Sequence, residues 1–143
     1  MNNKSVGITL VVIAATFLLQ LGIRKYIDRY PSGPTVNITE VYLDEENNTF
    51  YKAEPYEYFN LFTGIIVYYG ETGDLKVKAG VKDGLFHGPY NAWYDSGQEQ
   101  ISLIFKEGTK YKNFKAYYSN GKQVEGKSNE IAEKIFSGQI VLE

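Results

Sequence analysis

Only a few side chains of this 143-residue chain have a type and a position that suggest chemistry. His87, the one histidine, lies in the glycine-rich residues 84–88 (GLFHG) and could act as a general base. Such a base would need a reacting partner, and no serine or carboxylate stands at a spacing that marks it as the partner of His87. We therefore expect no catalytic residue and no enzyme activity.

Metal and cofactor sites are also not expected. Asp44, Glu45 and Glu46 carry carboxylates, but the alternating oxygen ligands and the distal glutamate of a calcium loop are missing around them. Residues 70–73 (GETG) are too short and too acidic for a phosphate-binding loop. The chain has no cysteine and a single histidine, which excludes disulfides, cysteine-based metal sites and histidine-rich metal sites.

The charge of the chain argues against nucleic acid as a partner. The formal net charge is −2, and residues 30–143 carry 11 lysines against 16 acidic side chains. A body with a net charge of −5 has no general attraction for phosphate backbones. Seven lysines in the C-terminal half could form a basic stripe for anionic lipid headgroups, although we interpret them as the outer face of a sheet. They are Lys76, Lys78, Lys82, Lys106, Lys110, Lys112 and Lys115.

A membrane anchor is expected at the N-terminus. Residues 6–23 form 18 successive positions without a charge, and a helix of that length spans about 27 Å. A cleaved signal peptide is the alternative, but no small-x-small cleavage site follows the run. We therefore expect residues 1–30 to be a single-pass membrane anchor with its flanks, and the secreted or periplasmic protein is the alternative. The side of the membrane that the rest of the chain occupies stays open.

Residues 31–58 are expected to be a linker followed by a hairpin. Prolines and a glycine in residues 30–34 (YPSGP) end any helix that precedes them. β-prone residues then occupy 36–43, the polar residues 44–48 (DEENN) predict a turn, and residues 49–51 resume a strand.

The most informative pattern is a repeat with a period of 24 residues. It includes glycines and a set of aromatic residues that keep the same step. The glycines, which we expect at structural turns, are Gly64 and Gly88, then Gly73, Gly97 and Gly121, then Gly84 and Gly108. The aromatic residues in phase are Tyr69, Trp93 and Tyr117.

Within each unit, apolar and polar residues alternate as they do in a half-buried strand. In residues 75–82, for example, Leu75, Val77, Ala79 and Val81 alternate with lysines and a glycine. Tight turns such as residues 95–97 (DSG) separate the strands. Each unit therefore predicts a β-hairpin, and because one hairpin is marginal in water, several should join into an antiparallel meander. The expected fold class is mainly β.

The repeat resembles the variant MORN repeat of the bacterial YwqK family of antitoxin-like proteins. The residues that carry this resemblance are 84–90 (GLFHGPY) and 93–97 (WYDSG), and the likeness extends over residues 59–143. Lys112 stands where Gly88 would repeat, so the array is expected to decay in its third unit, with a short helix or irregular cap over residues 129–136. Residues 136–141 echo residues 62–67 and are expected to open a further strand. The resemblance implies a noncatalytic repeat scaffold for contacts.

Strand parity divides the aromatic residues between the two faces of the predicted sheet. One face is mostly apolar, and we assign it to the core: Ile66, Tyr68, Gly70, Tyr90, Ala92, Tyr94, Phe114, Ala116 and Tyr118. On the opposite face, equivalent residues two strands apart would form a row spaced by about 9.6 Å. That row, Tyr69, Trp93 and Tyr117, is the predicted partner-binding surface, because Trp and Tyr often anchor interfaces. The alternative is that the C-terminal cap or residues 36–58 fold over it.

The function expected from the sequence is that of a membrane-tethered, noncatalytic interaction module that binds a protein partner. An antitoxin or immunity role is one form of this function, which the resemblance implies. An envelope structural protein and an accessory domain of an enzyme are the alternatives.

Overall fold

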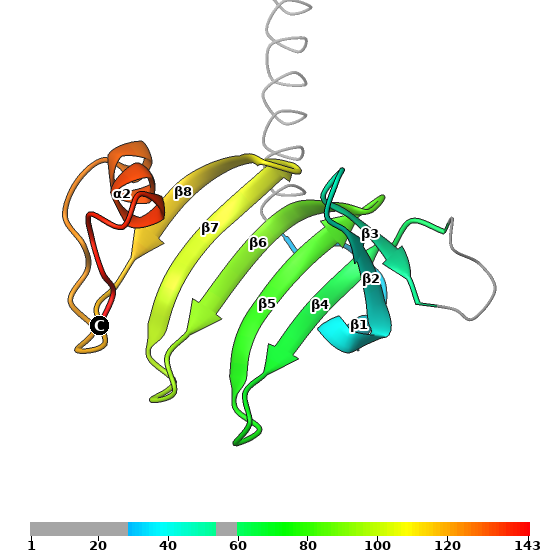
Figure 1. The fold of residues 1–143 in the computed structure, drawn as a ribbon, viewed down its shortest axis with the longest axis horizontal. Helices are drawn as coiled ribbons and strands as arrows, with labels where there is room; N and C mark the ends of the chain where they lie inside the picture. Colours follow the sequence, from blue (N-terminus) through cyan, green and yellow to red (C-terminus); the bar gives the residue numbers. More distant parts are fainter. Residues whose placement is uncertain (1–28, 54–59) are drawn as a thin grey trace, which may run out of the picture.

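The computed structural model describes residues 29–53 and 60–143, which form mainly β-structure (Figure 1). The apolar run at residues 6–23, where the sequence predicts a membrane anchor, lies outside the described residues. Within the described part of the chain, no helix is both long and apolar enough to cross a bilayer.

A six-stranded sheet forms the body of the molecule. Its strands lie in the order β1-β4-β5-β6-β7-β8, and from β4 onwards each strand pairs antiparallel with the next one along the chain. The antiparallel meander predicted from the repeat is therefore confirmed. Its strands are β4 (Gly64–Tyr69), β5 (Leu75–Lys82), β6 (Leu85–Trp93), β7 (Glu99–Glu107) and β8 (Lys110–Ala116).

The turns at one end of the sheet repeat with the 24-residue step. In each turn a backbone N–H donates to the carbonyl oxygen four residues further on, at 2.9 Å, and the glycine donates back to the first residue of the turn. The glycines Gly73, Gly97 and Gly121 have φ values of 84°, 80° and 82°. The first hydrogen bonds of the three turns are Gly70 to Asp74, Tyr94 to Gln98, and Tyr118 to Lys122.

Two of the glycines predicted at turns lie in strands instead. Gly64 is the first residue of β4, where a Cβ atom would lie 2.4 Å from the carbonyl oxygen of Pro34. Gly88 lies inside β6, with φ of 79°, where the register between β5 and β6 shifts. These two positions need glycine because of a close backbone approach and a bulge, and not because of a turn.

The segment before the repeats is folded differently from the prediction of one strand over residues 36–43. β1 (Thr35–Asn37) adds to the sheet parallel to β4, and a short 3-10 helix (Ile38–Glu40) follows it. Asn37 and Glu40 form a capping box that stabilises this change of direction. β2 (Val41–Asp44) and β3 (Thr49–Lys52) then pair as a separate hairpin, as predicted around residues 44–48.

The core lies on one face of the main sheet, which we call the front face and which faces the viewer in Figure 1. Ile66, Ala79, Tyr90 and Leu103 occupy facing positions on successive strands of this face. At one end of the face, Phe50 of the β2–β3 hairpin packs against Phe62, Ile66 and Val81. At the other end, the helix α2 (Ser128–Phe136) packs on β7 and β8.

The helix over residues 129–136 is confirmed, but the strand expected at residues 136–141 is wrong. Gly138 ends α2 with φ of 74°, and its N–H donates to the carbonyl oxygen of Ile135 at 3.0 Å. The N–H groups of Gln139 and Ile140 both donate to the carbonyl oxygen of Lys134. These donors close the helix terminus, so they are not available for pairing with another strand.

Candidate functional site

His87 lies on β6 and is held by the neighbouring strand. Its ring nitrogen Nδ1 lies 3.1 Å from the carbonyl oxygen of Lys106 on β7. A carbonyl oxygen only accepts hydrogen bonds, so Nδ1 carries the proton and donates it. His87 lines a small pocket of about 280 Å³ together with lysine and acidic side chains from the sheet end. Its one hydrogen bond joins two strands, which is a structural arrangement.

The acidic residues 44–46 form a turn. The Asp44 carboxylate accepts from the backbone N–H of Glu46 at 3.0 Å and from the side-chain amide of Asn47 at 2.8 Å. Both oxygens of Asp44 thus stabilise the connection between β2 and β3. Within residues 29–53 and 60–143, no group of three or more acidic or histidine side chains is placed to hold a metal ion.

The predicted row of Tyr69, Trp93 and Tyr117 lies on the back face of the sheet, opposite the core. Tyr69 ends β4, Trp93 ends β6, and Tyr117 follows β8, so the three residues occupy equivalent positions on alternate strands. Tyr69 is 46% exposed, and Trp93 and Tyr117 are half-buried. In the described residues of the two expected covers, the β2–β3 hairpin and α2 both pack on the front face, so neither of these elements lies over the row.

Residues 29–34, which we call the strap, cross the back face. The Tyr30 hydroxyl donates to Asn91 Oδ1 at 2.9 Å, and the Lys78 ammonium lies 4.5 Å from the centre of the Tyr30 ring. Asn91 in turn donates to Glu99 Oε1 at 2.8 Å. Burial, and to a smaller extent the charge of Glu99, raises the pKa of Tyr30 to about 12.

Gly80 makes room for the strap. A Cβ atom on Gly80 would lie 2.6 Å from Pro31 Cδ and 2.2 Å from the carbonyl oxygen of His87. The sequence predicts only a short linker at residues 30–34 and not this contact. The signal for it was Gly80 itself, which stands between Lys78 and Lys82 on the polar side of an otherwise regular alternation.

The lysines of the expected outer face have different surroundings. Lys76 is largely buried, with its side chain 15% exposed, and pairs with Asp95 at 2.6 Å. Lys78 lies under Tyr30, as described above. Lys78 lies opposite Asn91, Asn91 lies opposite Ser102, and Ser102 lies opposite Lys115, so Lys115 shares the back face with Lys78. Lys112 lies opposite Ile104, which is two residues after Ser102 on β7, so Lys112 belongs to the same face. Lys110 lies 3.6 Å from Glu107 at the end of the sheet.

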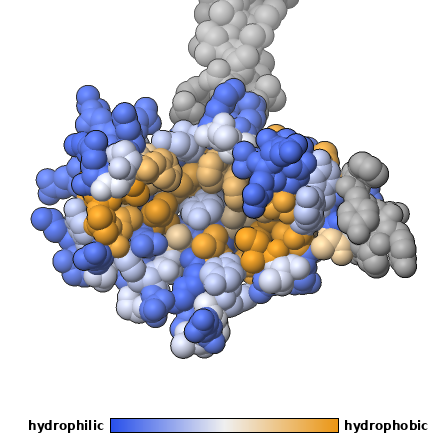
Figure 2. Space-filling model, in the orientation of Figure 1, coloured by the Kyte–Doolittle hydropathy of each residue, from blue (hydrophilic) through white to orange (hydrophobic). Residues whose placement is uncertain are grey.

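The front face holds a groove that could not be expected from the sequence pattern. It lies between the β2–β3 turn and the end of α2 and has a volume of about 520 Å³. Apolar side chains are exposed on this face between the hydrophilic hairpin and helix surfaces (Figure 2). Its lining residues are Asn47, Asn48, Leu85, Phe86, Leu103, Phe105, Glu107, Gly108, Thr109, Tyr111 and Phe136.

A continuous series of aromatic rings lies along the front face from the hairpin to the helix. Phe86 and Phe105 stack with centroids 4.9 Å apart and planes 17° apart. The ring centroids of Phe50 and Phe86 are 5.1 Å apart, and those of Tyr111 and Phe105 are 6.5 Å apart. Phe114 follows Tyr111 in the series, and Phe136 ends it, with its ring centroid 6.1 Å from that of Phe114. Rings that support one another in this way form a rigid apolar floor.

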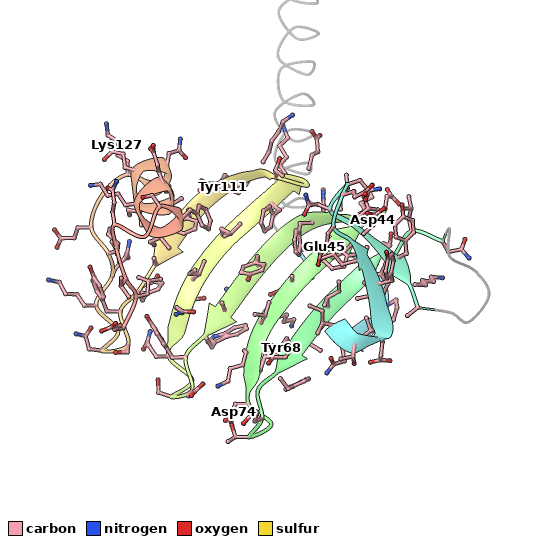
Figure 3. All side chains as sticks on the ribbon, viewed as in Figure 1. Asp44, Glu45, Tyr68, Asp74, Tyr111 and Lys127 are labelled. Carbon is pink, nitrogen blue, oxygen red and sulfur yellow. The ribbon has the colours of Figure 1, made fainter. Side chains whose placement is uncertain are left out.

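Part of the face that parity assigned to the core is therefore open to solvent. Phe136 is 71% exposed and Leu85 is 39% exposed at the two sides of the groove, and Tyr68 on the same face is 45% exposed. Tyr68 and Tyr111 lie on this side of the sheet, with Asp44 and Glu45 on the hairpin above it (Figure 3). Parity placed Tyr68 on this face, but it did not show that the two covers leave a gap between them.

Comparison of the chain with protein-family models, with curated proteins and with solved structures gave no match.

Proposed function

We propose that this protein is a membrane-tethered, noncatalytic β-repeat module that binds a protein partner in the front-face groove. The observation that carries the proposal is the aromatic groove of about 520 Å³ between the β2–β3 turn and α2. Exposed aromatic side chains on a rigid floor are common anchors of protein interfaces. The resemblance to bacterial MORN-type proteins agrees with a contact scaffold, of which an antitoxin or immunity role is one form.

Charge at the rim of the groove indicates the chemistry of the partner. Asp44, Glu45 and Glu46 precede the two asparagines that line the groove, and Glu107 lines its far end. Lys110 pairs with Glu107 and offsets part of this charge. We therefore propose that the partner inserts an apolar or aromatic side chain that is flanked by lysine or arginine, because the floor is apolar and the rim is acidic.

The groove, and not the row of Tyr69, Trp93 and Tyr117, is our proposed protein-binding surface. A concave apolar site buries more of an inserted side chain than an open row can. The tether at residues 6–23 rests on the apolar run in the sequence alone.

A selection of displayed peptides on the full-length protein in lipid nanodiscs tests the proposal. We expect the selected peptides to combine Phe, Leu or Trp with adjacent Lys or Arg. Phe136→Ala should weaken their binding by about ten-fold or more, because Phe136 is the most exposed ring at the groove. Val141→Ala is the matched control, since Val141 is 63% exposed and does not line the groove. Peptides that bind both variants equally, or that carry acidic flanks, would contradict the proposal.

A further inference from the structure

The position of the strap restricts how far the sheet can lie from the end of the apolar run. Tyr30 is fixed on the back face by its hydrogen bond to Asn91 and by Lys78. Only residues 24–29 separate it from residue 23, the end of the apolar run. Even fully extended, that connection spans no more than about 25 Å. If residues 6–23 cross a membrane, the back face is within about that distance of the bilayer surface.

The back face is basic. Lys78, Lys112 and Lys115 belong to it by strand register. Lys106 also belongs to it, because successive side chains of a strand point to opposite faces and the ring of the preceding Phe105 lies on the front face. Arg29 is exposed at the start of the strap. Two acidic residues oppose this charge. Glu99 lies on the back face, where it accepts a hydrogen bond from Asn91, and Glu125 is counted there because it follows Val124, which is buried on the core side. Positive charge therefore predominates on this face.

The other surfaces near the strap suit an anionic membrane less well. On the front-face covers, the hairpin carries Asp44, Glu45 and Glu46 against Lys52, and Glu130 and Glu133 of α2 are balanced by Lys127 and Lys134. The sheet end with the β5–β6 and β7–β8 turns has Asp83 and Glu107 against Lys82 and Lys110, so these four charges balance. The asymmetry of charge thus favours the back face as the one that faces negative charge.

The aromatic row lies on this same basic face. Tyr69, Trp93 and Tyr117 are at least partly exposed there, and neither the hairpin nor α2 covers them. Tyrosine and tryptophan are enriched at membrane–water interfaces, because their rings combine an apolar body with a polar group. Lysines beside such aromatic residues are typical of a surface that contacts anionic headgroups.

We propose that the back face of the main sheet lies against the anionic headgroup layer of the membrane, with the exposed Lys106 and Lys115 near the lipid phosphates and Tyr69, Trp93 and Tyr117 at headgroup level. This inference rests on the membrane tether of the proposed function. It directs the front-face groove away from the bilayer, where a protein partner can reach it.

Trp93 provides a direct readout, since it is the one tryptophan of the chain. The full-length protein is reconstituted into phosphatidylcholine vesicles with or without phosphatidylglycerol, both containing a lipid that carries a quencher on its headgroup. We expect Trp93 emission to be quenched strongly in the anionic vesicles and less in the neutral ones. Added salt should reduce the difference, because it screens the charges.

Paired lysine variants test whether this face makes the contact. Lys106→Gln with Lys115→Gln removes two exposed back-face charges, and Lys127→Gln with Lys134→Gln removes two charges on the front side. The first pair should weaken the surface contact by about five-fold for each lysine, and the second pair should leave the quenching unchanged. Melting temperatures of both variants establish that they are folded.

Flotation of the same vesicles separates failure of the tether from failure of this inference. Protein that does not float with either vesicle would overturn the tether and the inference together. Protein that floats with both vesicles but shows equal, weak quenching of Trp93 in both would overturn the inference and leave the tether in place. Equal effects of the two lysine pairs would also contradict it, because the contact would then not belong to the back face.

Discussion

At Gly97, the turn between β6 and β7 requires a φ of 80°, and no atom lies within 4 Å of the place that a Cβ would occupy. A side chain there would meet no clash, so its cost comes from the backbone conformation alone. We expect Gly97→Val to lower the free energy of unfolding by about 1 to 3 kcal/mol, as measured by urea denaturation.

Ser96→Ala is the control within the same turn. Ser96 Oγ accepts only a long hydrogen bond, 3.4 Å, from the N–H of Gln98. Its removal should therefore change the free energy of unfolding by about 0.5 kcal/mol or less. Small and equal effects of the two substitutions would show that the turn does not require a left-handed residue.

Tyr30 couples the strap to pH. Its pKa is raised to about 12 from an ordinary value of 10.0, so the folded protein keeps the proton where the unfolded chain loses it. The stabilisation that results is complete below about pH 10 and is lost as the pH rises towards about pH 12. We expect the melting temperature of the wild type to fall more steeply over this range than that of Tyr30→Phe.

Tyr30→Phe also removes the hydrogen bond to Asn91, so the variant should be less stable than the wild type at neutral pH. The measurement is thermal unfolding of both proteins at several pH values. If the melting temperatures of the two proteins fall in parallel from about pH 9 to pH 12, the Tyr30 hydroxyl is not buried on the back face. Burial also raises the pKa of the partly buried Tyr90, but this residue is present in both proteins and cancels in the comparison.

At the scale of elements, the features predicted correctly are those with local signals. Leu75, Val77, Ala79 and Val81 alternate with polar residues along β5, and turn residues follow at fixed steps, so strands and hairpins could be predicted from neighbours in the chain. β1 could not be predicted in this way. It has three residues, and its parallel pairing with β4 depends on where the strap leaves the back face.

The candidate groove could not be predicted from local pattern either. Parity placed Tyr90 and Phe114 on the apolar face, but it could not show which parts of that face the hairpin and α2 would cover. Phe136 was expected both at the end of a helix or cap and at the start of a strand, and it ends a helix beside the groove. Coverage of a sheet face is a tertiary property, because it depends on contacts between residues that are far apart in the chain.

The helix α2 stabilises the sheet end where the repeat decays. Ile131, which is 3% exposed, packs with Phe114 and Leu103 of the sheet. Replacement by alanine removes buried methyl groups and leaves a cavity, so Ile131→Ala should cost about 2 to 5 kcal/mol of unfolding free energy. Denaturant titration measures this loss, and a hydrophobic dye should bind more strongly as β8 becomes exposed.

Glu133→Ala is the control on the same helix, because Glu133 is exposed. It should change stability by about 0.5 kcal/mol or less. If Ile131→Ala were equally mild, α2 would not be part of the core, and the groove would lose one of its walls.

For the whole molecule, the two faces have different expected partners. The front face combines a groove with aromatic walls and acidic rims, and the back face combines lysines with an aromatic row and the strap. A sheet whose strands are joined by short turns holds these faces in a fixed relation to each other. A tether that leaves from the back face would therefore orient the groove as well as retain the protein.

This arrangement depends on residues 6–23 remaining part of the mature protein. We expect the chain to fractionate with membranes at its full mass of 16.2 kDa and to resist extraction with alkaline carbonate, because a helix of 18 uncharged residues is long enough to span the hydrocarbon core. Mass spectrometry of the membrane fraction measures both properties. A shorter mature form that begins near residue 24 would identify the segment as a cleaved signal peptide. The body would then reach a membrane only through its surface charges, and salt alone should release it.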